Sequence, residues 1–262
     1  MKTLLYWAQT IRAPFLQAAF IPVLVGTAVA YSEGHFSVWL FVLAAAANMA
    51  INAGTNLFND YYDHLSGNDE CNAHPTPFSG GSRMIQKGEI EPERVRKAGW
   101  ISFGIAAIIG IYLAAVSGWM LLIIGALGLW GAYAYTATPV KIGYRGIGEL
   151  LVGVLLGPLA VMGTYFVQTG RLSWSALYPS IPVGILVTCI LYVNEFPYYL
   201  ADRLVVKNTL LVVWVPGRAA SLYPVLMMSM YVSIGLALLA GRLPWSAALS
   251  LATLPLAWRA AR

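Results

Sequence analysis

Charged residues are scarce in this chain of 262 residues, because Asp, Glu, Lys and Arg together make up only 10% of it. An average soluble domain carries roughly 25%, so this chain cannot cover a water-exposed surface, which excludes an ordinary soluble protein and a disordered one. Cysteine is scarce as well: only Cys71 and Cys189 occur, far apart and without a Cys-x-x-Cys spacing. The sequence therefore predicts neither a disulfide framework nor a zinc site.

Apolar residues dominate instead, at 59% of the chain and a mean hydropathy of +0.68. A bilayer core of about 30 Å needs about 20 apolar residues per helix. The stretches without Asp, Glu, Lys or Arg are 13–32, 34–59, 98–140, 150–170, 172–194, 219–241 and 243–258. The third divides at Ser117-Gly118. We therefore expect an all-α polytopic membrane protein, a single-domain bundle of about eight transmembrane helices in two four-helix halves, about 1–140 and 141–262.

Basic residues indicate the orientation of the bundle. Of 16 Lys and Arg residues, 14 lie at the termini or in the connections on one side, and only Arg171 and Arg242 lie on the other. The positive-inside rule then places both termini and the long loops in the cytoplasm, with the chain in the inner (cytoplasmic) membrane. The net charge of +5 thus reports orientation in a lipid bilayer and not a nucleic-acid partner. No obligate protein partner is evident.

A polar stripe marks the end of the second predicted helix. Asn48, Asn52, Asn56 and Asp60 recur every four residues and Asp63 follows, so all lie on one helical face. A charge inside a membrane helix costs roughly 2.5–3.5 kcal/mol, so such residues usually face a cavity. Hydrogen bonding between helices remains an alternative for the first two asparagines. The two neighbouring acids repel each other unless a cation joins them.

A second stripe, made of Asn194, Tyr198 and Asp202, ends the sixth predicted helix with the same spacing. Both stripes end the second helix of a four-helix half, which suggests parallel repeats whose polar ends meet across a central cavity open to the cytoplasmic side. On an ideal helix Glu195 points away from this stripe.

Two carboxylate clusters around one cavity suit Mg²⁺ and a diphosphate. Magnesium is usually held by one or two carboxylates together with phosphate oxygens, and Arg or Lys neutralises the remaining phosphate charge. The basic residues on the correct side are Arg12, Arg83, Lys141, Arg145 and Lys207. Each also fits a role in membrane orientation or in contacts with lipid headgroups.

Several motifs in order resemble a known family. NLFNDYYDHLSGND (56–69) resembles the first aspartate-rich motif of the UbiA-type membrane prenyltransferases. Five further segments resemble the branch that prenylates 1,4-dihydroxy-2-naphthoate in menaquinone biosynthesis: RAPFLQAAFIPVLVG (12–26), PFSGGSRMIQKG (77–88), YTATPVKIGYRGIGELLVG (135–153), GTYFVQTG (163–170) and NEFPYYLAD (194–202). The resemblance implies an all-helical bundle, usually of nine spans, with the aspartate motifs at a cytoplasmic-side cavity.

The resemblance also implies roles for individual residues. The catalytic acids would be Asp60, Asp63 and Asp202, and the metal ligands Asn56, Asp60, Asp63 and Asp202. The residues expected to bind substrate are Arg12, Asn52, Arg83, Lys141, Arg145, Glu149, Asn194, Tyr198 and Lys207. Among these, Glu149 would position a neighbour or the aromatic substrate.

The second motif departs from the family pattern at three positions. Tyr198 replaces the first Asp of NEFPDYxAD, Val206 replaces the Gly before Lys207, and Trp214 replaces the Arg of VVRLG. The lost carboxylate weakens the expected second metal site.

The implied activity is transfer of a polyprenyl group from its diphosphate to an aromatic acceptor, most specifically 1,4-dihydroxy-2-naphthoate, with Mg²⁺ assisting ionisation. Aromatic faces would stabilise the allylic cation, with Tyr61, Tyr62, Tyr135 and Tyr165 as candidates. Three alternatives remain: a UbiA-related terpene cyclase, a catalytically impaired variant lacking one acid of the second motif, and a transporter. Against the transporter, the acids lie at one membrane face and not near the midplane.

Overall fold

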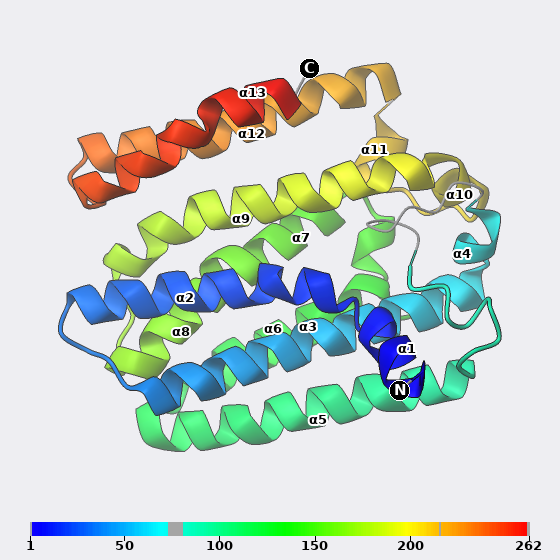
Figure 1. Ribbon diagram of the computed structural model, residues 1–262, viewed down its shortest axis with the longest axis horizontal. Coiled ribbons are helices and arrows are strands. Elements are labelled where there is room, and N and C mark those ends of the chain that lie inside the picture. The colour runs from blue at the N-terminus through cyan, green and yellow to red at the C-terminus, as the bar shows by residue number, and fades with distance from the viewer. Residues whose placement is uncertain (1, 73–80, 215, 261–262) are drawn as a thin grey trace.

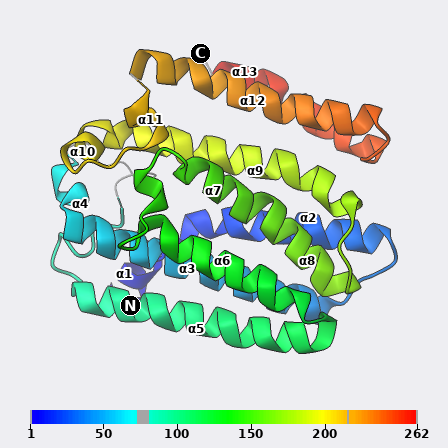
Figure 2. The same cartoon turned by 180° about the vertical axis from the view of Figure 1, so that it is seen from behind.

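The structure is a computed structural model that describes residues 2–72, 81–214 and 216–260 (Figure 1). Within these residues it contains helices and no β-strand, apart from an isolated bridge between Arg145 and Asn208. The long helices run side by side, and α6, α7 and α8 cover the face opposite α2 (Figure 2). The predicted all-α membrane fold is therefore confirmed.

The elements of the first part of the chain are α1 (Lys2–Thr10), η1 (Ala13–Leu16), α2 (Gln17–Ser32), α3 (Val38–Ser66), α4 (Asn68–Cys71), α5 (Pro92–Ser117) and α6 (Met120–Thr136). Those of the second part are η2 (Ile142–Tyr144), α7 (Gly148–Val154), η3 (Leu155–Leu159), α8 (Ala160–Thr169), α9 (Trp174–Glu195), η4 (Phe196–Tyr198), α10 (Tyr199–Leu204), α11 (Leu210–Val213), α12 (Pro216–Leu239), η5 (Trp245–Thr253) and α13 (Leu254–Ala260).

Six described helices are long and apolar enough to span a membrane, namely Ala13–Ser32, Val38–Ser66, Pro92–Ser117, Gly148–Thr169, Trp174–Leu204 and Gly217–Leu239. A seventh predicted span is the shorter apolar helix Met120–Thr136. The eighth, predicted over 243–258, consists of the 3₁₀ helix η5 and α13. The protein is a multi-pass membrane protein. The count of eight and the division near residue 140 stay predictions.

Local signals explain where the site-bearing helix α3 begins and ends. The Ser37 hydroxyl caps its first turn by accepting a hydrogen bond from the Leu40 N–H (3.4 Å). At its other end Gly67 adopts a left-handed conformation with φ 75°, which glycine tolerates without steric cost. The chain then re-enters a short helix, α4. The polar stripe therefore lies at the end of one uninterrupted helix.

Close packing holds α3 against α5. A Cβ atom placed on Gly54 of α3 would lie 2.4 Å from Cδ1 of Phe103 on α5, a distance that no real Cβ contact shows. Phe58 contacts the same helix, since its ring stacks edge-on with Phe103 at a centroid distance of 5.1 Å. Small residues at helix interfaces of membrane proteins allow such close approach. This packing fixes the rotation of α3 and thereby the direction of its polar face.

The two ends of the bundle carry different connections and polar contacts. The long connections, with α4, α10 and α11, lie together at one end (Figure 1). At the other end Glu33 accepts hydrogen bonds from the hydroxyls of Ser175 (2.6 Å) and Tyr165 (2.5 Å) and from Arg171 (3.1 Å). These bonds, led by that of Ser175, lower the pKa of Glu33. One carboxylate thus ties the α2–α3 connection to α8 and α9 at the end opposite the polar stripes.

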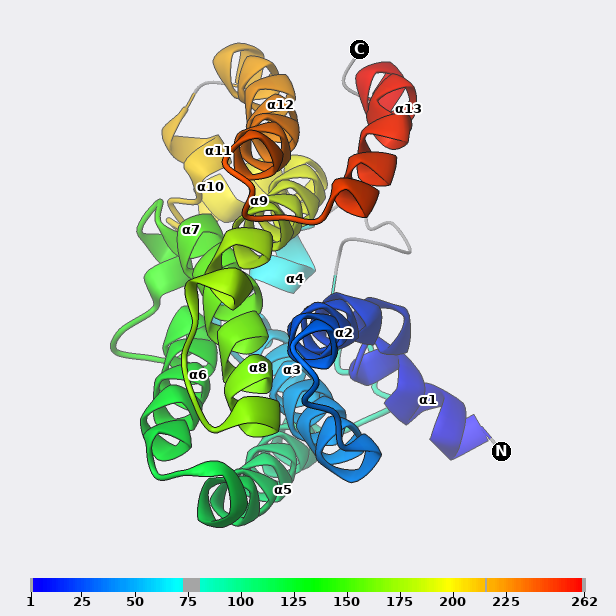
Figure 3. The ribbon, with the colours of Figure 1, turned by 90° about the vertical axis from the view of Figure 1, so that its left-hand side faces the viewer.

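The C-terminal helices form an outer layer. Figure 3 shows α12 and α13 beyond α9, away from the helices that carry the first stripe. Cys189 is buried in the α9–α12 contact together with Met227 and Tyr231, where it packs as a small core residue. Both cysteines are free.

Candidate functional site

The first stripe meets a cation from the N-terminal segment. Arg12 lies between α1 and η1 in a left-handed conformation (φ 53°), and its Nη2 donates to Oδ1 of Asp60 (2.6 Å) and to Oδ1 of Asn59 (2.8 Å). The N–H of Ser82 donates to Oδ2 of Asp60 (3.2 Å). Burial alone would lower the pKa of Arg12, but Asp60 raises it above its usual value. The guanidinium therefore stays charged beside the first acid of the motif.

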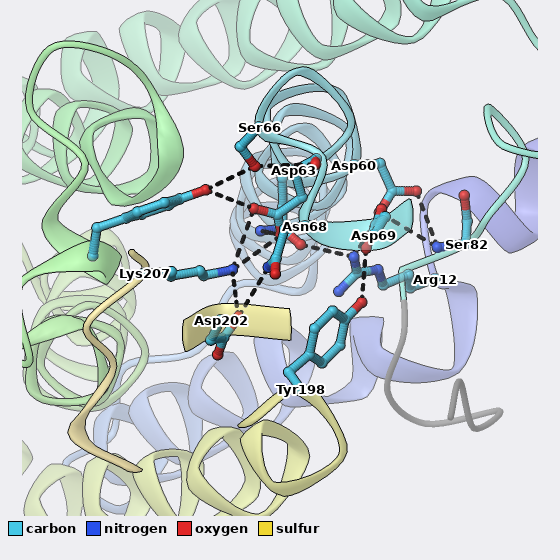
Figure 4. Close-up of polar contacts among 12 residues, drawn as sticks. Arg12, Asp60, Asp63, Ser66, Asn68, Asp69, Ser82, Tyr198, Asp202 and Lys207 are labelled. Atoms are coloured by element: carbon cyan, nitrogen blue, oxygen red, sulfur yellow. Dashed lines mark hydrogen bonds and ion pairs between the residues drawn. The ribbon is translucent and has the colours of Figure 1, made fainter. Parts of the chain in front are cut away.

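Lys207 connects the two stripes (Figure 4). Its Nζ lies 3.1 Å from Oδ2 of Asp63 on α3 and 3.9 Å from Oδ1 of Asp202 on α10. Burial would lower the pKa of Lys207, but the two carboxylates raise it well above the usual range. The hydroxyl of Tyr144 also donates to Oδ1 of Asp63 (3.2 Å). Lys207 and Tyr144, from two other parts of the chain, thus converge on the carboxylate of Asp63.

The backbone next to Lys207 shows the consequence of one departure from the family pattern. Val206 has φ 57°, a left-handed conformation that is a genuine outlier for a β-branched residue. Glycine, the residue that the resemblance leads one to expect at this position, adopts it freely. The turn that delivers Lys207 into the cluster is therefore strained by the side chain of Val206.

Tyr198 takes part in the cluster through a third acid. Its hydroxyl donates to Oδ1 of Asp69 (2.8 Å), and Figure 4 shows the phenol pointing toward that carboxylate. Burial, with repulsion from Asp63 and Asp60, raises the pKa of Asp69 to about 7. The tyrosine that replaces an acid of the second motif thus supplies a hydrogen-bond donor to an acid of the first.

The sequence analysis missed Asp69 and its neighbour Asn68. Asn68 donates from Nδ2 to Oδ1 of Asp202 (2.9 Å), so the short helix α4 inserts between the two stripes. Helical periodicity does not predict the position of these residues, because α3 ends at Gly67 and the chain changes direction there. The one available signal was Gly67 itself, a helix-terminating residue inside the quoted motif.

A polar cavity of about 190 Å³ lies between the stripes. The predicted site residues that line it are Arg12, Asn52, Asn56, Asp63, Asn194, Tyr198, Asp202 and Lys207. Asp60 adjoins it through Arg12. Glu195 lines it too, against our expectation, since it is the last residue of the regular helix α9 and lies next to Asn194, so the cavity wall is wider than the predicted stripe. The cavity is therefore lined from both halves of the chain.

A larger apolar cavity of about 310 Å³ lies among α3, α5, α6, α7, η3 and α8. It shares five lining residues with the polar cavity, namely Asn52, Thr55, Tyr135, Val152 and Leu156. Ile111 and Leu122 line it although they are exposed on the outer surface of the bundle. Together the two cavities suit an amphiphile with an anionic head and an apolar tail.

Four predicted substrate-binding residues do not line the polar cavity. Arg83 donates to the backbone carbonyl of Asn72 (3.1 Å), and Lys141 lies over the ring of Tyr144 at 4.8 Å from its centroid. Arg145 is exposed, and Glu149 accepts a hydrogen bond from the Leu210 N–H (2.7 Å). Part of the motif around Arg83, residues 77–80, lies outside the described residues. The roles of these four stay predictions.

The four tyrosines expected to stabilise the allylic cation also lie in different places. Tyr135 lines both cavities. The hydroxyls of Tyr61 and Tyr62 bond to Glu93 (3.3 Å) and Tyr133 (3.0 Å), whereas Tyr165 binds Glu33 at the opposite end. Of the four, only Tyr135 is in position to contact a ligand in the cavities.

The side-chain oxygens of this site suit a magnesium ion only if a bound diphosphate supplies further ligands. Among the described residues, no three carboxylate, His or Cys groups converge on a single point. Magnesium usually takes only one or two carboxylates and completes its shell with phosphate oxygens and water. Among the described residues, no group donates a hydrogen bond to the buried Oδ1 of Asn68, which is an oxygen of the kind that magnesium prefers. The residues present therefore fit the ion together with a bound diphosphate.

Comparison with known proteins identifies the family. The sequence model of the UbiA prenyltransferase family matches residues 19–262. The chain belongs to the UbiA prenyltransferase family. It is 34% identical over 262 residues to the 1,4-dihydroxy-2-naphthoate octaprenyltransferase of Mycobacterium tuberculosis, a match covering 100% of this chain and 86% of the relative. It is 31% identical over 238 residues to the Bacillus subtilis enzyme of the same name, covering 90% and 75%.

A solved structure shares the fold of this UbiA-family chain. It is described as a UbiA homolog from Archaeoglobus fulgidus bound to DMAPP and Mg²⁺, and it superimposes with a TM-score of 0.67 at 13% identity. The superposition covers 97% of this chain and 85% of that chain. The helical bundle of the UbiA prenyltransferases therefore extends over nearly the whole protein.

Proposed function

We propose that this prenyltransferase transfers a polyprenyl group from its diphosphate to an aromatic acceptor, and that the acceptor is 1,4-dihydroxy-2-naphthoate. The observation that carries the proposal is the junction of a polar cavity, lined by acids and by Arg12 and Lys207, with an apolar cavity in a UbiA-family chain. The relatives named for that acceptor support its identity.

The diphosphate binds in the polar cavity. The half-buried Arg12 and the buried Lys207 are the cations there: Arg12 lies 2.6 Å from a carboxylate oxygen of Asp60, and Lys207 lies 3.1 Å from one of Asp63. The residues that would hold Mg²⁺ are Asp60, Asp63, Asp69 and Asp202 with Asn56. When bound, Mg²⁺ neutralises the diphosphate and favours ionisation of the allylic C–O bond as a Lewis acid. Arg12 and Lys207 then share their charge between the acids and the phosphate oxygens.

The polyprenyl tail occupies the apolar cavity. Tyr135 and Asn52 lie at the junction of the two cavities, where the allylic carbon must lie if head and tail occupy one cavity each. The face of the Tyr135 ring stabilises the allylic cation. Beyond the cavity the tail passes into lipid beside Ile111 and Leu122, which are exposed on the outer surface.

The polar end of the bundle faces the cytoplasm, and the protein lies in the inner membrane. This orientation rests on the 14 of 16 Lys and Arg residues at that side. It brings the diphosphate-binding end to the compartment in which soluble Mg²⁺ and the aromatic acid are available.

Incubation of the purified protein with Mg²⁺, a polyprenyl diphosphate and a panel of aromatic acids, followed by mass spectrometry, tests the proposal. We expect a prenylated product from 1,4-dihydroxy-2-naphthoate and little from 4-hydroxybenzoate. Absence of any prenylated aromatic product while pyrophosphate is released would refute it.

A terpene cyclase is the second candidate, because an aromatic residue, Tyr198, stands where the family has an acid and reaches Asp69 at 2.8 Å. Cyclic products formed from the prenyl diphosphate alone would identify that activity.

A further inference from the structure

The apolar cavity reaches the outer surface of the bundle between α5 and α6. Ile111 of α5 and Leu122 of α6 line the cavity, and these residues are 62% and 49% exposed. Gly110 of α5 and Gly125 of α6 line it as well, and a Cβ atom placed on either glycine would meet no packed neighbour within 4 Å. We call the part of the cavity wall formed by these four residues the side opening. Each helix contributes to it one residue that has no side chain.

Packing closes the contact between α5 and α6 on both sides of the side opening. Figure 2 shows α6 running back beside α5 from the turn at Gly118. Near this turn, Leu113 of α5 and Leu121 of α6 are buried in one apolar cluster. Toward the polar end of the bundle, the rings of Trp100 on α5 and Tyr133 on α6 lie 5.2 Å apart between centroids. The side opening is therefore bounded at both ends.

The side opening faces the hydrocarbon part of the bilayer. Residues 98–140 contain no Asp, Glu, Lys or Arg, and α5 is one of the helices long enough to span a membrane. Ile108 of α5 and Leu127 of α6 are exposed on the outer surface of the same helices. Exposed apolar side chains of a membrane-spanning helix contact lipid tails, which are as apolar as they are. A molecule that passes through the side opening therefore enters lipid and not water.

The apolar cavity is too small for a long polyprenyl chain. A cavity of about 150 Å³ in a protein core holds one benzene molecule, so a cavity of about 310 Å³ holds about two such rings, roughly the bulk of two isoprene units. A geranyl group fits into this volume. The distal part of an octaprenyl group does not, and it must continue beyond the cavity.

The polar cavity has its own route to the outer surface. Ile190 of α9 lines the polar cavity and is 41% exposed. Figure 3, viewed along the long helices, shows α9 and α5 on opposite sides of α8, so the two routes lead to different faces of the bundle. A tail that leaves beside Ile190 bypasses the apolar cavity. A tail that starts beside Tyr135, at the junction of the two cavities, follows the apolar cavity to the side opening.

We propose that the distal isoprene units of the donor leave the protein through the side opening, and that Gly110 and Gly125 thereby determine which donor lengths the protein accepts. This inference rests on the proposed prenyl transfer. The first two or so isoprene units stay in the cavity, as its volume requires, and all further units extend into the bilayer. Donors from geranyl to octaprenyl diphosphate then present the same enclosed part to the protein. The parent accordingly tolerates donors of different lengths.

Competition between two donors in one sample tests the side opening. The purified protein in detergent is incubated with Mg²⁺, 1,4-dihydroxy-2-naphthoate and equal amounts of geranyl and octaprenyl diphosphate. Mass spectrometry then measures the ratio of octaprenylated to geranylated product. Because both donors compete for the same active molecules, this ratio does not depend on the fraction of the protein that is folded. The parent should form both products, and formation of the geranylated product alone would overturn the proposal.

Gly110→Leu and Gly125→Leu each place a branched side chain in the side opening. Each should lower the product ratio by at least about tenfold, because extra methylene groups in an occupied space are costly. Gly110→Ala and Gly125→Ala add only a methyl group and should lower the ratio less, and they decide the test if a leucine variant does not fold. Gly104→Leu is the matched control on α5: Gly104 also has no packed neighbour within 4 Å, but it is exposed and is not among the residues that line the cavity. Its product ratio should equal that of the parent.

Binding of unreactive thio-analogues of the two donors measures the same selectivity without the reaction. In both leucine variants the Kd of the octaprenyl analogue should rise at least about tenfold, whereas the Kd of the geranyl analogue should stay at the parental value. An unchanged product ratio in both leucine variants, or an equal fall in Gly104→Leu, would overturn the side opening. A fall in Ile190→Trp without a fall in the glycine variants would overturn it as well, because the tail would then leave beside α9.

The two readouts separate this inference from the proposed function. If the parent prenylates no aromatic acid but the analogues bind with the expected dependence on length, the proposed function fails and the side opening stands as the exit for the tail. If the parent forms both products and the leucine variants keep its ratio, the side opening fails and the proposed function stands.

Discussion

Lys207→Met is the substitution that tests the electrostatics of the candidate site. Lys207 is buried and is the cation that Asp63 (3.1 Å) and Asp202 (3.9 Å) share. Methionine keeps the apolar stem and leaves two buried carboxylates without their counter-charge. Removal of one partner of a buried ion pair costs about 3–5 kcal/mol. At about 2–4 °C per kcal/mol for a chain of this size, the melting temperature should fall by roughly 10 °C.

The assay is thermal unfolding of the purified protein in detergent, with and without Mg²⁺. Because the variant leaves the two acids uncompensated, Mg²⁺ should raise its melting temperature more than that of the parent. Lys141→Met is the matched control, since Lys141 is partly exposed and contacts the ring of Tyr144, an interaction worth about 0.5–1 kcal/mol. An equal loss in both variants, or an equal response to Mg²⁺, would refute the argument that Lys207 neutralises a metal-binding pair.

Three further changes have defined outcomes. Val206→Gly relieves a left-handed conformation (φ 57°) that costs about 1–2 kcal/mol and should raise the melting temperature, whereas Val205→Gly (φ −96°) should lower it. Tyr198→Phe removes the hydroxyl donor of a buried carboxylate, a bond worth about 1.5–3 kcal/mol, so chemical denaturation should show a loss of stability that Tyr199→Phe does not. Glu33 has a lowered pKa in the folded state, so it stabilises the fold above its unfolded pKa, and this stabilisation is lost as the pH falls through its folded pKa. In Glu33→Gln the free energy of unfolding should therefore fall less steeply at acid pH than in the parent. An unchanged acid dependence would exclude this contribution.

The membrane fold was predictable because its signal is additive along the chain. A span needs only a sufficient length of apolar residues, and each charge-free stretch forms helix over most of its described length. The stripe on α3 was predictable for a related reason: Asn52, Asn56 and Asp63 belong to one regular helix, so spacing alone places them on one face.

The rest of the site depends on places where the helices stop being regular. The cavity wall includes Glu195 beside Asn194 at the end of α9, a position that the predicted stripe leaves out. The turn at Gly67 returns Asp69 to the cluster although its spacing from Asp63 fits no helical face. Arg83 and Arg145 lie in connections, where no periodicity indicates direction. Pattern analysis therefore found the acids that continue a four-residue spacing, such as Asp60 and Asp202, and missed Asp69, which follows a turn.

The apolar cavity that is lined by outward-exposed Ile111 and Leu122 sets the concentration scale on which this protein operates. A polyprenyl tail that enters beside these residues comes from the bilayer. The fraction of protein with a bound tail therefore depends on the number of prenyl diphosphate molecules per lipid molecule, and not on their concentration in the buffer. The prenylated product carries neither the diphosphate of the donor nor the carboxylate of the acceptor, so it is uncharged, largely apolar and partitions into the bilayer along the same lateral path, while pyrophosphate diffuses into water. The two products therefore leave into different phases. Dilution with extra lipid should slow turnover even when every bulk concentration is held constant.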